Sequence, residues 1–169
     1  MIEVKRKEKF LRLFKLFEER LNFDFDVNSF QDKIKLQKYV YISEFFGFNH
    51  DYQYNKYIRG PYSPDLADDY YSIDKSDIPG DYSSILNDFN HAEFLDFVED
   101  KDARRLELTA TVLSVWKDYR YKFQGTELAS KVIDTSADIK SKASKENIKF
   151  ITRNLEKKGI IDLDMSSQN

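Results

Sequence analysis

Residues 35–47 read KLQKYVYISEFFG, and this stretch decides the fold. Drawn as a helix, it has apolar and aromatic side chains around most of its circumference. Tyr39 and Val40 lie on one face of such a helix, whereas Tyr41 and Phe45 lie on almost the opposite face. Little of the circumference is left for water. We therefore predict that this helix is the central element of the core.

Sequence signals on both sides bound this helix. Asn28, with Gln31 three positions later, has the form of a capping box and marks the expected start, and Gly47 marks the expected end. Residues 57–69 then read YIRGPYSPDLADD. Within them, Ser63 followed by Pro64 is a strong signal for another helix start, because the serine hydroxyl can cap a free backbone amide.

Composition excludes several classes of protein. The chain of 169 residues contains 41% hydrophobic and 34% charged residues, which is typical of one globular domain. It has no cysteine, so disulfide frameworks, thiolate nucleophiles and cysteine zinc sites are excluded. The first residues lack the apolar core of a secretion signal, and no run of about 18 apolar residues is present. We expect a cytoplasmic protein with no membrane partner.

Charge is segregated along the chain. Residues 60–102 contain twelve acidic residues against two lysines, whereas residues 140–158 contain seven basic residues against two acids. The acidic segment would repel nucleic acid, and the basic segment would attract it. The alternative reading of both segments is an ordinary solvated surface.

The remaining periodicity predicts helices over about 4–21 and 141–158, and a loop or helix junction at 134–138. Arg105–Leu108 reads as a brief strand, after which Thr109 would cap a further helix. The alternation over Tyr52–Ile58 also predicts a short strand, which Gly60-Pro61 would end.

The fold class that follows is mainly α (α+β), a helical domain around an aromatic-rich central helix. A terminal strand over Ile160–Leu163 would follow the last helix, which is the order of a winged-helix element. We predict a single domain over 1–165, with a subdivision considered near 99–105, and a disordered tail at 166–169.

The search for chemistry is mostly negative. His50 and His91 are the only histidines and belong to no ligand motif, and the chain has neither a glycine-rich phosphate loop nor a G-x-S-x-G elbow. We therefore expect no enzyme activity, no catalytic residue, no metal site and no cofactor. The alternative left open is a divalent-metal-dependent hydrolase or nuclease that uses Asp65, Asp68 and Asp69.

A candidate protein-binding surface lies at the second stretch. It consists of six residues, Arg59, Tyr62, Ser63, Asp65, Asp68 and Asp69. Arg59 and Tyr62 would flank a helix N-terminus, which suits an anion or a peptide terminus. The structural alternative is that Ser63 is only a cap and that Asp65 only complements the helix dipole.

A candidate DNA-binding surface lies on the last helix. Lys142, Lys145, Lys149 and Arg153 fall on one side of it, and apolar residues lie nearly opposite. Such a helix could contact DNA phosphates. Glu146 falls among these cations, and the net charge of −3 is unlike that of most free-standing DNA binders.

Two motifs carry a resemblance to a known family. The segments K-x-x-L-Q-K-Y-V-Y-I-S-E-F-F-G (33–47) and Y-x-x-G-P-Y-S-P-D-L-A-D-D (57–69) resemble the core of the YwgA-like proteins, and Leu108-Thr109 is similar to their later L-T segment. More distantly the chain is similar to the SocA-type antitoxin group, or Panacea domain. Arg59 departs from that pattern, where a tyrosine or tryptophan is frequent. The resemblance implies a small helical domain without catalytic residues, whose relatives act as antitoxins or protease adaptors by binding other proteins.

We therefore expect a non-catalytic regulatory domain that binds another protein, antitoxin-like or adaptor-like. The alternatives are a winged-helix-type DNA-binding transcription regulator and the metal-dependent hydrolase. The sequence leaves a homodimer open.

Overall fold

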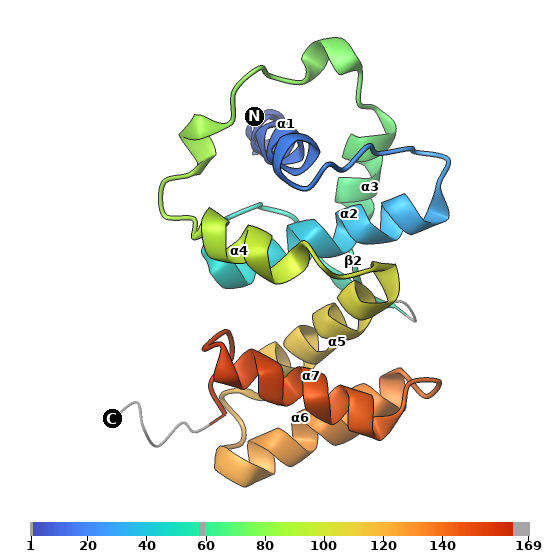
Figure 1. Ribbon diagram of the computed structural model, residues 1–169, viewed down its shortest axis with the longest axis vertical. Helices are drawn as coiled ribbons and strands as arrows, with labels where there is room; N and C mark the ends of the chain where they lie inside the picture. The colour runs from blue at the N-terminus through green and yellow to red at the C-terminus, as the bar shows by residue number, and fades with distance from the viewer. Residues whose placement is uncertain (1, 58–59, 164–169) are drawn as a thin grey trace. The chain divides into compact units, whose positions relative to one another are not determined.

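The computed structural model describes residues 2–57 and 60–163 and is mainly helical, so the predicted α+β class is confirmed (Figure 1). The described residues form seven α-helices and one two-stranded antiparallel sheet. The chain divides into two units. Unit 1 comprises Met1–Asn55 and Tyr62–Ala103, and unit 2 comprises Lys56–Pro61 and Arg104–Asn169. The predicted tail at 166–169 lies outside the described residues.

Unit 1 holds four helices and three short 3₁₀ turns. They are α1 (Ile2–Arg20), α2 (Phe30–Ser43), η1 (Glu44–Phe46), α3 (Pro64–Tyr71), η2 (Lys75–Asp77), η3 (Ser83–Ile85) and α4 (His91–Val98). Strand β1 (Asn55–Tyr57) pairs with β2 (Gly60–Tyr62) in the region where the chain passes between the units.

Helix α2 is the buried centre of unit 1, as predicted. Every residue from Leu36 to Ser43 is buried, and Lys38 is only 2% exposed. The rings of Tyr39 and Phe17 lie 5.2 Å apart, which joins α2 to α1, and a further contact of 5.7 Å joins Phe46 to α4 through Phe94. Burial of such aromatic side chains supplies most of the stability of a core.

The ends of α2 differ slightly from the prediction. Ser29, not Asn28, caps the helix, because its hydroxyl accepts the backbone amide of Asp32 at 3.2 Å. The amide of Asn28 is instead bound by Asp26 in the preceding turn. Gly47 ends η1 with a φ of 97°, as predicted for a helix terminator. Phe30, at the start of the helix, is exposed and not part of the core.

Unit 2 contains α5 (Ala103–Tyr119, whose first residue belongs to unit 1), α6 (Gly125–Ile139) and α7 (Lys145–Lys157). Helices α6 and α7 lie side by side (Figure 1). Buried residues from all three helices form its core: Leu106, Leu113, Leu128, Val132, Ile148, Ile151 and Leu155.

Several predicted elements of unit 2 were wrong. Arg105–Leu108 and Thr109 lie inside α5. The strand prediction treats the charged residues of this segment as a solvent-exposed face, but Glu107 is buried. The predicted loop or helix junction at 134–138 is instead a continuous part of α6, in which Ser136 is buried one turn after Val132.

The predicted terminal strand is also absent from the described residues. Ile160 and Ile161 form a bend whose amides donate to the Leu155 carbonyl. The rest of the segment is held by hydrogen bonds from the Trp116 indole N–H to the Asp162 carbonyl (2.9 Å) and from the Gly125 amide to the Leu163 carbonyl (2.8 Å). The winged-helix element therefore lacks its wing strand. None of the described helices combines the length and hydropathy that a bilayer crossing requires.

Candidate functional site

The two sequence motifs meet through Gln37. Its side-chain amide donates to the Ser63 carbonyl and accepts the Ser63 amide, both at 2.9 Å. The Ser63 hydroxyl caps α3 by accepting the Leu66 amide, and its side chain is fully buried. Ser63 is therefore a structural residue that offers no polar atom to a partner.

Asp69 also points into unit 1. Its carboxylate accepts the Tyr52 hydroxyl at 2.6 Å and lies 3.4 Å from the Arg6 Nε atom. Burial, and then the bond to Asp69, raise the pKa of the Tyr52 hydroxyl far above its usual value. The neutral phenol therefore stays a donor and keeps the buried carboxylate satisfied.

The other predicted protein-binding residues are placed differently. Asp65 and Asp68 are exposed on α3, with Asp65 3.5 Å from Arg6, and Tyr62 is half-buried at the end of β2. Arg59 lies outside the described residues. Among the described residues of this predicted surface, Asp65 and Asp68 on α3 are the exposed ones.

No three His, Asp or Glu side chains in the described part of the chain are grouped so that they could hold a metal ion. The predicted triad is divided, because Asp69 is bound to Tyr52 and Arg6 while Asp68 faces solvent. The hydrolase alternative has no ligand cluster to build on here.

Two of the four predicted DNA-binding cations are engaged with acids. Lys145 lies 2.8 Å from Asp134 on α6, and Lys149 lies 3.5 Å from Glu146. The hydrogen bond from Lys145 holds the pKa of the Asp134 carboxyl below its usual value. Lys142 lies before α7, in the turn that precedes its Ser144 cap, and is exposed like Arg153.

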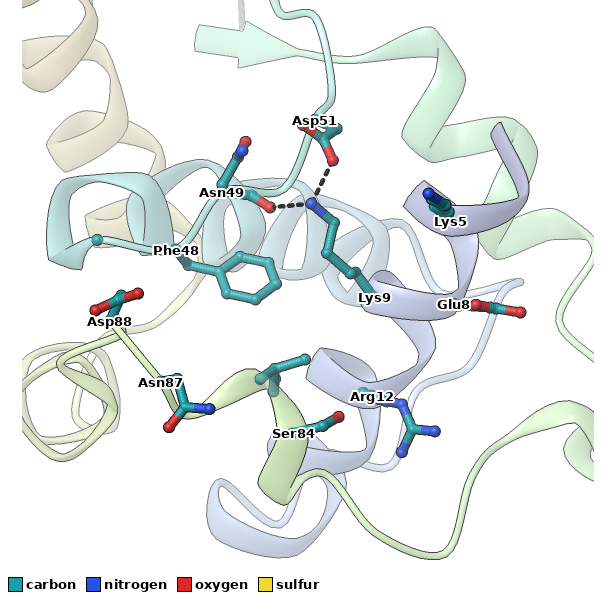
Figure 2. Close-up of a pocket in the computed structure, with 12 residues that line it drawn as sticks. Lys5, Glu8, Lys9, Arg12, Phe48, Asn49, Asp51, Ser84, Asn87 and Asp88 are labelled. Atoms are coloured by element: carbon teal, nitrogen blue, oxygen red, sulfur yellow. Dashed lines mark hydrogen bonds and ion pairs between the residues drawn. The ribbon is translucent and has the colours of Figure 1, made fainter. Parts of the chain in front are cut away.

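A groove that the sequence did not predict opens in unit 1 (Figure 2). Its volume is about 530 Å³, within the range of sites that bind small ligands or peptide side chains. The groove is lined by Lys5, Glu8, Lys9, Arg12, Gly47, Phe48, Asn49, Asp51, Ser84, Ile85, Asn87 and Asp88.

Three segments form the walls of the groove. Helix α1 supplies four charged residues at helical spacing, and the segments 47–51 and 84–88 supply the rest. Lys9 reaches across to the Asn49 carbonyl at 2.7 Å and to the Asp51 carboxylate (Figure 2). Phe48 and Ile85 are the largely buried apolar residues of the lining, and most of the other lining residues are charged or polar.

The two loop walls are fixed against each other. A Cβ atom at Gly47 would lie 2.4 Å from the Asp88 carbonyl oxygen, so only glycine fits between them. The rings of Phe48 and Phe89 pack at 5.2 Å directly behind this contact. Asp51 and Asp88 both adopt positive φ, 65° and 61°, which is uncommon for residues other than glycine. The groove is preorganised by this backbone geometry.

Residues 49–52 alternate between the groove and the interior. Asn49 and Asp51 line the groove, whereas His50 and Tyr52 are buried. The Nδ1 atom of His50 accepts the Tyr52 amide at 2.9 Å, and its Nε2 atom lies 3.1 Å from Glu44. The alternation of groove-lining and buried residues is the one sequence signal for this wall of the groove. It does not identify a groove, because the same alternation is typical of a β-strand.

The lining residues include no histidine or cysteine, and Ser84 is their only hydroxyl. Both signs of charge stand above apolar side chains, which suits recognition of a polypeptide segment. No family model, curated protein or solved structure matches the chain.

Proposed function

We propose that this protein is a non-catalytic regulatory domain that binds another protein, antitoxin-like or adaptor-like, and that the groove of unit 1 receives a segment of the partner. The observation that carries the proposal is the preorganised groove, whose lining combines the exposed Lys5, Glu8 and Asp88 with the buried ring of Phe48 (Figure 2). The resemblance to YwgA-like proteins supports the same class of function.

The surroundings of the groove favour a basic partner. Of the twelve acidic residues between 60 and 102, all except Asp69 are exposed. Such a field steers a cationic segment toward the groove and raises its association rate. Asp65 and Asp68 on α3 belong to this field, so part of the surface predicted from the sequence remains in the proposal.

The test places the photo-crosslinking amino acid p-benzoylphenylalanine at Asn87, an exposed groove residue, or at Ser76, an exposed residue of η2 outside the groove. Light in the native cell should couple one defined partner through position 87 and not through position 76. Affinity capture without crosslinking then tests the position itself. Asn87→Arg should abolish affinity capture of that partner, whereas Ser76→Arg should leave it intact.

The double variant Asp65→Lys/Asp68→Lys separates the two surfaces. We expect slower association and retained crosslinking if the groove holds the partner and α3 only steers it. Equal crosslinking from positions 87 and 76, or unchanged capture by Asn87→Arg, would contradict the proposal.

A second candidate function is DNA binding through α7 and the turn before it, favoured by the exposed Lys142 and Arg153, which have no ion partner in the described part of the chain. It predicts salt-dependent duplex binding that disappears when Lys142, Lys145, Lys149 and Arg153 are all replaced by alanine. Capture of the protein partner should survive in the same quadruple variant.

A further inference from the structure

A dense group of aromatic and basic side chains marks the end of α5 in unit 2. Residues 116–123 read WKDYRYKF, with four aromatic residues, three basic residues and one acid. The protein-binding proposal for unit 1 does not use them. We call Trp116, Arg120, Tyr121, Lys122, Phe123 and Lys131 the aromatic–cation cluster.

The guanidinium group of Arg120 lies between two rings. Its central carbon is 4.4 Å from the centre of the Trp116 ring and 4.7 Å from that of Tyr121. The hydrogen bond from the Trp116 indole N–H to the Asp162 carbonyl fixes the Trp116 ring in place. Tyr121 is 79% exposed, so its ring remains available for a further stacking partner.

A second group of aromatic rings and a cation follows the first along the chain. The Phe123 ring packs against Tyr119 with 5.6 Å between centres, and the Lys131 ammonium lies 5.2 Å from the centre of Phe123. Each group therefore combines an aromatic ring with a cation. The ring attracts the cation placed over its face, which favours this position of the charge.

The local charge is positive. The carboxylate of Asp118, the one acid in the octapeptide, is ion-paired with Lys56. Lys122 and Lys131 are exposed, and the Arg120 Nε atom is buried without a hydrogen-bond partner. Residues 104–163 as a whole contain thirteen basic and eight acidic residues, a net charge of +5.

We propose that the aromatic–cation cluster binds single-stranded nucleic acid with little preference for base sequence. Tyr121 stacks on an unpaired base, and Arg120, Lys122 and Lys131 neutralise the adjacent phosphates. Bases in a duplex are already stacked on one another, so an exposed ring on a protein surface favours a single strand. A purely anionic polypeptide would use the cations but not the ring.

Fluorescence anisotropy of the full chain tests this proposal with labelled oligothymidylate and oligouridylate of about twelve nucleotides, at about 50 mM salt. We expect binding of at least one strand and a loss of about tenfold in affinity for Tyr121→Ala. The double variant Lys122→Gln/Lys131→Gln should reduce the salt slope, by about 0.7 per lost phosphate contact. The two strands distinguish DNA from RNA as the source.

Tyr71→Ala is the matched control. Tyr71 is likewise exposed, at 59%, and has a cation over its ring, Lys33 at 5.4 Å, but it lies in the acidic unit 1. Its removal should leave affinity unchanged. Absence of binding by the parent chain, equal affinity of Tyr121→Ala, or equally strong competition by polyglutamate would each overturn the proposal. Unchanged oligonucleotide binding by the α7 quadruple variant separates this surface from the DNA-binding candidate.

Discussion

Unit 1 and unit 2 each keep an acidic side chain in the interior, and they stabilise it by different means. In unit 1, Asp69 is bound by the neutral Tyr52 hydroxyl and by Arg6. In unit 2, Glu107 on α5 is paired with Lys140 at 3.2 Å, and both side chains are at most 6% exposed. One interior therefore depends on a phenol that stays protonated, and the other depends on a buried ion pair.

The surfaces of the two units differ in charge. Unit 1 carries the exposed acids of residues 60–102, whereas residues 104–163 of unit 2 have a net charge of +5. The total charge of −3 hides this contrast. This contrast in charge underlies the two proposals above, a basic partner for unit 1 and nucleic acid for unit 2, and the following experiments test the difference between the units. The single tryptophan, Trp116, reports on unit 2 alone.

The largest expected effect is in unit 2. Lys140→Met removes the ammonium that pairs with the buried Glu107 carboxylate and should lower the free energy of unfolding by about 3–5 kcal/mol. Urea unfolding followed by Trp116 fluorescence measures the change. The double variant Glu107→Leu/Lys140→Met should recover most of the loss, and failure to recover would show that the site needs the ion pair for packing.

The next effect is in unit 1. Gly47→Ala places a side chain at positive φ and against the Asp88 carbonyl, so we expect a loss of about 3 kcal/mol. Far-UV circular dichroism in urea should register it while the Trp116 transition stays in place. Gly80→Ala is the control, because a Cβ atom added there would meet no atom within 4 Å and the change should stay within about 0.5 kcal/mol. Equal effects at the two glycines would contradict the fixed groove walls.

A smaller effect separates the units at high pH. Burial raises the pKa of Tyr39, Tyr52, Tyr54 and Tyr70, and all four belong to unit 1. An acid whose pKa is raised by folding contributes stability below its unfolded pKa, about 10 for tyrosine, and that stability is lost as pH rises above it.

Unit 1 should therefore unfold before unit 2 in an alkaline titration. Tyr52→Phe should cost about 1–2 kcal/mol at neutral pH, because Asp69 loses its donor, and should weaken the alkaline dependence. Unfolding of both units at one pH, in parent and variant alike, would show that the tyrosines do not set the difference.

The smallest effect concerns the exposed pair of Asp134 and Lys145. The lowered pKa of Asp134 contributes stability above its unfolded value of about 4, which is lost as pH falls through the folded pKa. In Lys145→Ala, carbon-13 NMR should show the carboxyl titrating near its ordinary value, with the Trp116 transition almost unmoved. An unaltered titration would mean that Lys145 is free to contact DNA.

Local signals predicted the parts of the fold that they control. The aromatic pattern predicts the buried helix α2, and the cap of α3 at Ser63 follows from hydroxyl chemistry at a Ser-Pro start. The strand prediction within α5 is wrong because the pairing of Glu107 with Lys140 is a tertiary contact that reverses the usual meaning of a charged residue.

The site was harder to predict for the same reason. Ser63 and Asp69 look like surface residues in the sequence, but Gln37 and Tyr52 draw them inward. The groove joins residues 5–12, 47–51 and 84–88, which no local pattern connects. Gly47 is recognisable as a helix terminator, whereas its tight contact with Asp88 arises only in the folded chain.

Gln37 has one further consequence. The chain leaves unit 1 after Asn55 and returns to it at Tyr62. Gln37 binds the chain on both sides of this excursion. Its backbone carbonyl accepts the Tyr54 hydroxyl at 3.2 Å, and its side chain binds the backbone of Ser63. One glutamine of α2 therefore anchors both segments of unit 1 that flank the β1–β2 pair.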